Sequence, residues 1–327
     1  MMRLAWLLFF VLLASGLSPR VEAQQRGCTV QSASQFDFGH PGANPTSAVT
    51  TTADVRVRCE GNPPQRGDTV KVCVGVDPWF LGWLGPVRYM TRGSIFFGDF
   101  LQHQIYRDSA SGPVAGLGNA SAVGYLTLDQ GPTNAPYGEA LITLHGVIEP
   151  GQNGLPAGTY RESNIGLEVR STTNLGESCG DAPVRAMDQT YAVAVLDGSC
   201  TVVAQDLAFG SHSQLSGAVP ATTSIGVTCT RDTAYTVRMD GGTTANDVAD
   251  RRMGLNGTGP AAQGVAYQLR HSGPNGPLWG DGTSGTSTLS GTGTGGSQTL
   301  PVYGRVLPQA VPLPGRYEDT VTVTVQY

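Results

Sequence analysis

The chain ends in the stretch 314-PGRYEDTVTVTVQY-327, and this stretch decides how the rest of the 327 residues is interpreted. Within it, Val321, Val323 and Val325 alternate with polar residues. Such a period of two is typical of a strand that buries one face. We therefore expect a strand at the very end of the sequence, with the three valines facing a core.

An earlier stretch, Pro156 to Arg170 (PAGTYRESNIGLEVR), has the same Pro, Gly and Tyr turn before an alternating strand. There the chain continues and supplies another strand-like run, Thr190 to Leu196. With Tyr191, Val193 and Val195 on one face, that run would close the sheet of the first half. The C-terminal stretch has no such continuation. The second half is therefore expected to lack its last strand and to borrow one from another chain.

The composition favours strands and turns over helices. The sequence contains 45 Gly and 21 Pro, many Thr, Ser and Val, and almost no capped stretch with a period of 3.6 residues. Its formal net charge is −5. Removal of residues 1–23, which carry two arginines and one glutamate, changes that charge to −6. A mildly acidic chain of this kind is a poor candidate for binding nucleic acid.

The N-terminal segment has the pattern of a secretory signal. Arg3 precedes an apolar run from Leu4 to Leu13, and a Val21-Glu22-Ala23 ending predicts cleavage before Gln24. A membrane anchor is the alternative, but the run is shorter than the ~20 residues that a span needs. An exported chain with an even number of cysteines is expected to form disulfides. The six are Cys28, Cys59, Cys73, Cys179, Cys200 and Cys229.

An internal repeat divides the chain in two. Cys28-Thr29-Val30 and Cys200-Thr201-Val202 start the copies, and each copy has a second cysteine 31 or 29 residues later, at Cys59 and Cys229. This matched spacing predicts one disulfide in each copy. The match continues through a Phe-Gly turn and an Arg-x-Met strand. We expect two copies of one Ig-like antiparallel β-sandwich, in residues 24–197 and 198–327.

Cys73 and Cys179 have no counterpart in the second copy. They form either a third disulfide inside the first copy, which we favour, or a free reactive pair. No two cysteines have C-x-x-C spacing and no histidine lies near them in ligand spacing, so no metal site is expected.

The two copies differ most between Asp77 and Val87. The first copy reads DPWFLGWLGPV there, whereas the second has the polar loop DGGTTANDVAD at Asp240 to Asp250. Proline and glycine around large apolar residues predict an ordered turn that presents them to an apolar surface. The alternative is that the loop folds back to cap the sandwich or packs on the second domain. The candidate surface-binding residues are Trp79, Phe80, Leu81, Trp83 and Leu84. By contrast, Phe96, Phe97 and Phe100 are interpreted as core strand or turn residues.

The paired Cys-Thr-Val starts, the Phe-Gly turns and the terminal Pro-Gly-Arg-Tyr-Glu-Asp-Thr-Val-Thr-Val resemble the spore coat protein U domain family. That family includes subunits of archaic (Csu-type) chaperone-usher pili of Gram-negative bacteria. The resemblance implies an incomplete Ig-like fold that the N-terminal extension of the next subunit completes. It also implies three partners: a periplasmic pilus chaperone, an outer-membrane usher and an adjacent pilin subunit that donates the strand.

Only Gln24 to Gly27 precede Cys28 after the expected cleavage, whereas a donor arm needs about 10 residues at ~3.3 Å each. A chain that accepts a strand but donates none resembles the tip adhesin of these pili. It would be exported through the periplasm to the cell surface and would attach to an apolar abiotic or host surface, supporting biofilm formation.

Three other functions are compared with the tip adhesin. A lectin-like tip would bind a specific glycan or host protein, and a pilus structural subunit would have no adhesive role. An exported hydrolase is disfavoured because the five histidines are scattered and neither G-x-S-x-G nor H-E-x-x-H occurs. We therefore expect a protein that is not an enzyme and has no cofactor.

Overall fold

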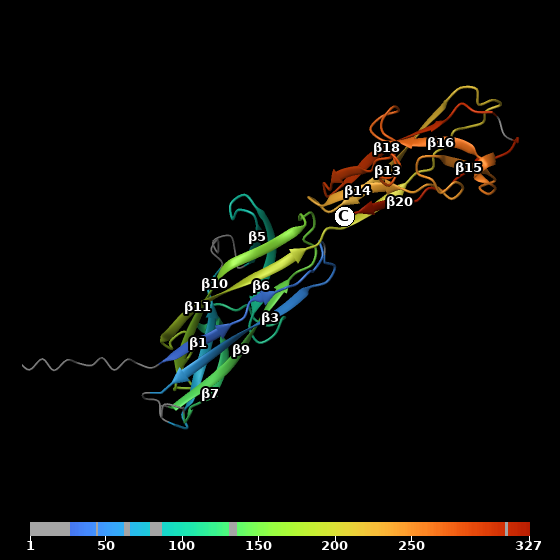
Figure 1. The fold of residues 1–327 in the computed structure, drawn as a ribbon. Coiled ribbons are helices and arrows are strands. Elements are labelled where there is room, and N and C mark those ends of the chain that lie inside the picture. Colours follow the sequence, from blue (N-terminus) through green and yellow to red (C-terminus); the bar gives the residue numbers. More distant parts are fainter. Residues whose placement is uncertain (1–26, 44, 62–65, 79–86, 131–135, 311–312) are drawn as a thin grey trace, which may run out of the picture.

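The computed structural model describes residues 27–43, 45–61, 66–78, 87–130, 136–310 and 313–327, and these form two β-domains in series (Figure 1). Strands β1 to β11 make the N-terminal domain and strands β12 to β20 the C-terminal domain. The predicted signal, residues 1–23, lies outside the described residues. Within the described ranges, no helix is long and apolar enough to cross a membrane.

The N-terminal domain contains eleven of these strands and one short 3-10 turn. They are β1 (Cys28–Ala33), β2 (Phe36–Asp37), β3 (Val49–Glu60), β4 (Thr69–Val76), β5 (Arg88–Arg92), β6 (Asp99–Tyr106), η2 (Gly118–Ala120), β7 (Ala122–Thr127), β8 (Asp129–Gln130), β9 (Pro136–Ile148), β10 (Gly158–Thr172) and β11 (Val184–Leu196).

The N-terminal strands form one continuous path, β1-β3-β9-β6-β5-β10-β11-β2, with β4 and β7 attached through β10. The pattern of β3 shows why these residues form strands. Ala53, Val55, Val57 and Cys59 are buried while the residues between them are exposed or half-buried, as in a strand with one face on a core.

Strand β10 is enclosed on both edges. It pairs antiparallel with β4 on one side and with β11 on the other, and β11 in turn pairs parallel with β2. The run Thr190 to Leu196 therefore closes the N-terminal sheet, as the sequence predicted.

The face of β11 that points inward differs from the expected one. Ala192, Ala194 and Leu196 lie in the core, whereas Tyr191 is 40% exposed. The physical reason lies opposite Ala194, where the buried ring of Tyr160 takes up the space that a larger side chain would need.

The C-terminal domain repeats this plan with fewer strands. They are β12 (Cys200–Ala204), β13 (Val219–Cys229), β14 (Ala234–Met239), β15 (Arg251–Leu255), η3 (Ala261–Gln263), β16 (Val265–Arg270), β17 (Leu289–Thr292), β18 (Ser297–Val306), β19 (Tyr317–Glu318) and β20 (Val323–Gln326). One sheet has the order β12-β13-β18-β16-β15-β19 and the other the order β17-β14-β20.

Strand β20, the predicted terminal strand, is an edge strand. It pairs antiparallel with β14, from Met239↔Val323 to Thr236↔Gln326. Among the described residues, no strand pairs with its other edge. The chain end lies on the side of the C-terminal domain that faces the N-terminal domain (Figure 1).

Three disulfides link the cysteines. Cys28–Cys59 and Cys200–Cys229 join the first strand of each domain to the second, as the matched spacing predicted. Cys73 and Cys179 form the third bond, inside the N-terminal domain.

Charged residues connect the two domains. Arg92 of the N-terminal domain lies 3.2 Å from Asp99 and 3.0 Å from Asp232 of the C-terminal domain. Arg231 pairs with Asp99, and its carbonyl accepts a 3.1 Å hydrogen bond from the N–H of Ala157. The contact between the domains is therefore strongly polar.

Candidate functional site

The described part of the C-terminal domain contains an open groove with a volume of about 1000 Å³. One wall is the segment 204–212 that follows β12, and the other is the segment 313–323 that leads into β20. Its floor is mostly apolar and consists of Ile225, Met239, Met253, Val265, Tyr267, Leu269, Val302 and Val306. An open groove with an apolar floor beside an unpaired strand edge fits an extended peptide.

Two of the three valines predicted to face a core belong to the second wall of this groove. Val321 and Val323 line it, and all three valines are half-buried against the C-terminal core. Sequence reasoning missed the floor and the first wall, where Leu207 and Phe209 pack. The repeated Phe-Gly turn at Phe209 was the available signal, because its counterpart Phe38 lies in the N-terminal core.

The residues predicted to bind a surface, Trp79, Phe80, Leu81, Trp83 and Leu84, lie outside the described residues. The structure does describe both ends of their loop. β4 ends at Val76 just before it, and β5 begins at Arg88 just after it. Asp77 and Arg88 therefore form the base of this loop.

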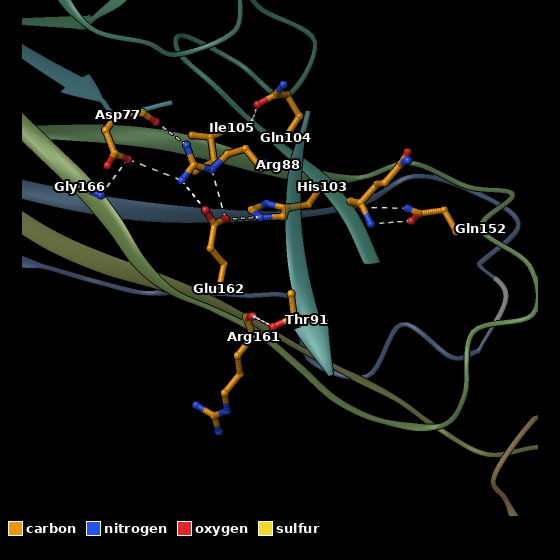
Figure 2. A network of polar contacts seen from close by, with 11 residues as sticks. Asp77, Arg88, Thr91, His103, Gln104, Ile105, Gln152, Arg161, Glu162 and Gly166 are labelled. Atoms are coloured by element: carbon orange, nitrogen blue, oxygen red, sulfur yellow. Dashed lines mark hydrogen bonds and ion pairs between the residues drawn. The ribbon is translucent and has the colours of Figure 1, made fainter. Parts of the chain in front are cut away.

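A buried polar cluster ties the base of the loop to the core of the N-terminal domain (Figure 2). Arg88 donates hydrogen bonds of 3.2 Å and 2.5 Å to the two oxygens of Glu162, and both side chains are only 5% exposed. Arg88 also donates to the carbonyl of Asp77 at 2.5 Å. On the other side of Glu162, the Nε2 atom of His103 lies 2.6 Å from its carboxylate.

Burial dominates the electrostatics of this cluster. It lowers the pKa of His103, although the hydrogen bond with Glu162 opposes that shift, so His103 is neutral at pH 7. It raises the pKa of Asp77, which the charge of Arg88 only partly offsets. A buried ion pair that shares several hydrogen bonds holds its partners in one geometry. The cluster can thus position the base of the loop.

The C-terminal domain has a matching cluster at the side of the groove. Arg251 is buried and donates to the carbonyl of Asp240 at 2.9 Å. The hydroxyl of Tyr267 donates to Asp319 at 2.6 Å, in the place of the contact between His103 and Glu162. Burial alone would raise the pKa of Asp240. Hydrogen bonds from Thr322 and Gly242, together with the positive charge of Arg251, hold that pKa below its usual value.

Two aromatic residues interpreted as core or turn lie in an exposed turn. Phe96 and Phe97 occupy the turn between β5 and β6, and Phe97 is 93% exposed. Phe100 lies in β6, where its ring packs edge-on against Tyr89. Among the residues that the structure describes, no group of three His, Cys, Asp or Glu could hold a metal ion.

The sequence profile of the family described as Spore Coat Protein U domain matches residues 17–164 and 186–324. Curated protein sequences give no match. One similar solved structure is the CsuC-CsuE chaperone-tip adhesion subunit pre-assembly complex from archaic chaperone-usher Csu pili of Acinetobacter baumannii, at 15% identity over 92% of this chain and 100% of that chain, with a TM-score of 0.48.

Two further solved structures have lower scores. The CupB6 tip adhesin from Pseudomonas aeruginosa is 10% identical over 91% of this chain and 94% of its own, with a TM-score of 0.36. CfaE, the adhesive subunit of CFA/I fimbria of enterotoxigenic Escherichia coli, is 11% identical over 93% of this chain and 78% of its own, with a TM-score of 0.31.

Proposed function

Because this chain belongs to the Spore Coat Protein U domain family, we propose that it is the tip adhesin subunit of a chaperone-usher fimbria. The observation that carries the proposal is the free edge of β20 beside an apolar groove of about 1000 Å³. In this proposal a strand of the adjacent pilin fills the groove and joins the chain to the fibre. Before assembly, a periplasmic chaperone covers the groove and an outer-membrane usher exchanges the chaperone for the pilin.

The exposed edge itself supports the need for such partners. An unpaired strand edge next to apolar side chains is a site of aggregation unless another strand covers it. The N-terminal domain needs no strand from another chain, because β11 covers the corresponding edge of β10. One domain that is complete and one that accepts a strand suit the end of a fibre, with the complete domain pointing away from it.

Thermal unfolding tests the proposed groove. A synthetic peptide with the donor-arm sequence of a pilin from the same fimbria should raise the midpoint of the C-terminal domain by ~10 °C or more, because it buries about four apolar side chains. The matched control is the Val321→Asp variant, which places a charge in the groove and should abolish the shift. A wild-type protein indifferent to every donor-arm peptide would disprove strand acceptance.

We further propose that the loop containing Trp79, Phe80, Leu81, Trp83 and Leu84 attaches the tip to an apolar abiotic or host surface and so promotes biofilm formation. The sister domain supports this assignment, since it has the polar stretch 241–250 between the equivalent strands β14 and β15. The buried pair of Arg88 and Glu162 supports it as well, because it fixes the loop base on a rigid strand.

Replacement of Trp79, Phe80 and Trp83 together by Ser should abolish attachment to a polystyrene surface while leaving pili assembled. The matched control replaces Phe96 and Phe97, two exposed aromatics elsewhere on the same domain, and should leave attachment unchanged. Retained adhesion in the triple variant would remove the loop from the proposal. A lectin-like tip is separated by competition, since only that function is inhibited by free sugars.

A further inference from the structure

Matching hydrogen bonds align β10 with the segment from β19 to β20, which has one residue fewer after the position of Glu162, where β10 has a register shift. The hydroxyl of Tyr160 donates to the carbonyl of Pro156, and that of Tyr317 to the carbonyl of Leu313, in each case four residues back. Farther along, the N–H of Gly166 donates to Asp77 at 3.0 Å. Its counterpart is the N–H of Thr322, which donates to Asp240 at 2.9 Å.

This alignment makes β11 a template for the strand that is absent from the C-terminal groove. In the N-terminal domain, Ala192 lies opposite Glu162 and Ala194 opposite Tyr160. Both alanines are completely buried. Small residues fit there because the side chains of Glu162 and Tyr160 already fill the core in front of them.

At the next inward-facing position of β11 the side chain is large. Leu196, also buried, lies opposite Gly158, which has no side chain to occupy the space. From N- to C-terminus, β11 therefore presents a small, a small and a large aliphatic side chain at alternate positions.

Along the groove of the C-terminal domain, the residues equivalent to Glu162, Tyr160 and Gly158 follow the same order: two with large side chains, then a glycine. Asp319 and Tyr317 stand at the places of Glu162 and Tyr160, and Gly315 stands at the place of Gly158. A second hollow of about 510 Å³ shares Leu313 and Tyr317 with the groove. A side chain from the neighbouring strand lies against each glycine, Arg92 at Gly158 and Leu255 at Gly315. The place opposite Gly315 therefore matches the one that Leu196 occupies in the N-terminal domain.

We infer that the strand accepted by the C-terminal domain runs antiparallel to β19 and β20 and carries a small residue facing Asp319, a small residue facing Tyr317 and a large aliphatic residue facing Gly315. This inference rests on the proposed function and specifies its partner. It selects among pilin donor arms by the spacing small-x-small-x-large.

The test uses the full chain, extended at its C-terminus by a copy of the β11 segment that takes the place of the missing strand. A copy of Val184–Leu196 is fused after Tyr327 through a short Gly-Ser loop, which suffices because adjacent antiparallel strands need only a hairpin. Fusion also makes the outcome independent of weak peptide affinity. The copy should raise the melting midpoint of the C-terminal domain by about 10 °C or more over the unextended chain.

Substitutions made in the appended copy alone then test the size pattern. Ala192→Leu with Ala194→Leu should remove at least about half of that gain, and Leu196→Ala should also reduce it. Tyr191→Ser, on the outward face, should change it little. Leucine is no worse than alanine as a strand former, so a loss from the leucine pair reports space and not strand propensity.

A reciprocal change in the groove completes the test. Tyr317→Ala makes room in front of the second small position, so it should restore part of the gain to the copy that carries the leucine pair. If the leucine copy stabilises as well as the native copy, the size pattern is wrong while strand acceptance stands. If no copy stabilises the domain, the groove does not accept a strand and the proposed function fails with it.

Discussion

Strand β10 and the segment from β19 to β20 are nearly the same structure in two different surroundings. Each has near its start a tyrosine whose hydroxyl donates a hydrogen bond to a carbonyl four residues back. Each also pairs antiparallel with the strand before the loop at Asp77 or Asp240. Yet β10 also pairs with β11, whereas β20 has β14 as its partner within the described part of the chain.

The consequence appears in the side chains that these strands present to the core. Ile165, Leu167 and Val169 are at most 2% exposed, whereas the equivalent residues Val321, Val323 and Val325 are only half-buried. Filling the groove would bury about four apolar side chains, or roughly 6 to 12 kcal/mol as an upper estimate. That is comparable with the whole stability of a typical domain, ~5 to 15 kcal/mol. A single covering strand therefore decides whether such a sandwich is complete.

The largest expected effect comes from spoiling the covering strand of the N-terminal domain. Ala194→Asp would place a carboxylate against the buried ring of Tyr160, and we expect a loss of more than ~4 kcal/mol. In calorimetry, the unfolding transition of the N-terminal domain should fall to or below that of the C-terminal domain.

Tyr191→Asp is the control for that change, because Tyr191 lies on the outward face of the same strand. It should cost ~1 kcal/mol or less. Equal losses from the two substitutions would mean that β11 does not cover the core through its alanine face.

A smaller effect compares equivalent carboxylates in the closed and the open domain. Glu162→Gln leaves the buried guanidinium of Arg88 without its main counter-charge, which should cost about 3 to 5 kcal/mol. Asp319→Asn keeps an oxygen for the N–H groups of Thr243 and Thr244 at a half-exposed site and should cost ~1 kcal/mol.

Urea unfolding of the two single variants measures this difference. In the chain extended by a copy of β11, Asp319 becomes covered as Glu162 is, and the cost of Asp319→Asn should rise. If Glu162→Gln lowers the free energy of unfolding no more than Asp319→Asn does, enclosure by β11 does not determine how much the cluster stabilises its domain.

Much of the fold could be predicted because the chain repeats itself. The paired cysteine spacings predicted the Cys28–Cys59 and Cys200–Cys229 disulfides, and the alternation of Val321, Val323 and Val325 predicted an edge strand without a following partner. The inward face of β11 was assigned wrongly, since size is a poor guide there. Tyr191 and Val193 are larger than Ala192 and Ala194, but the space behind the strand is already filled.

The candidate site was harder to predict from sequence. The groove floor gathers Ile225, Tyr267 and Val302 from three strands, so no single stretch of sequence shows it. The polar cluster was missed because charged residues such as Asp77 and Arg88 at strand ends usually indicate solvent contact. Their repetition at Asp240 and Arg251 was a usable signal, since solvated charges have no reason to recur at equal places.

The smallest expected effect depends on pH and on the residue that faces the carboxylate in each domain. His103 has a pKa lowered by burial, so between about pH 6.5 and that lower value the unfolded state binds more protons than the folded one. The stability of the N-terminal domain should therefore fall as pH drops from 7.5 to 5. Tyr267, at the equivalent place, has a raised pKa and does not titrate in this range.

Thermal scans of His103→Gln should show a flatter pH profile for the N-terminal transition. His271→Gln is the control, because it should alter only the C-terminal profile. An N-terminal profile that keeps its slope in His103→Gln would assign the acid sensitivity to other groups.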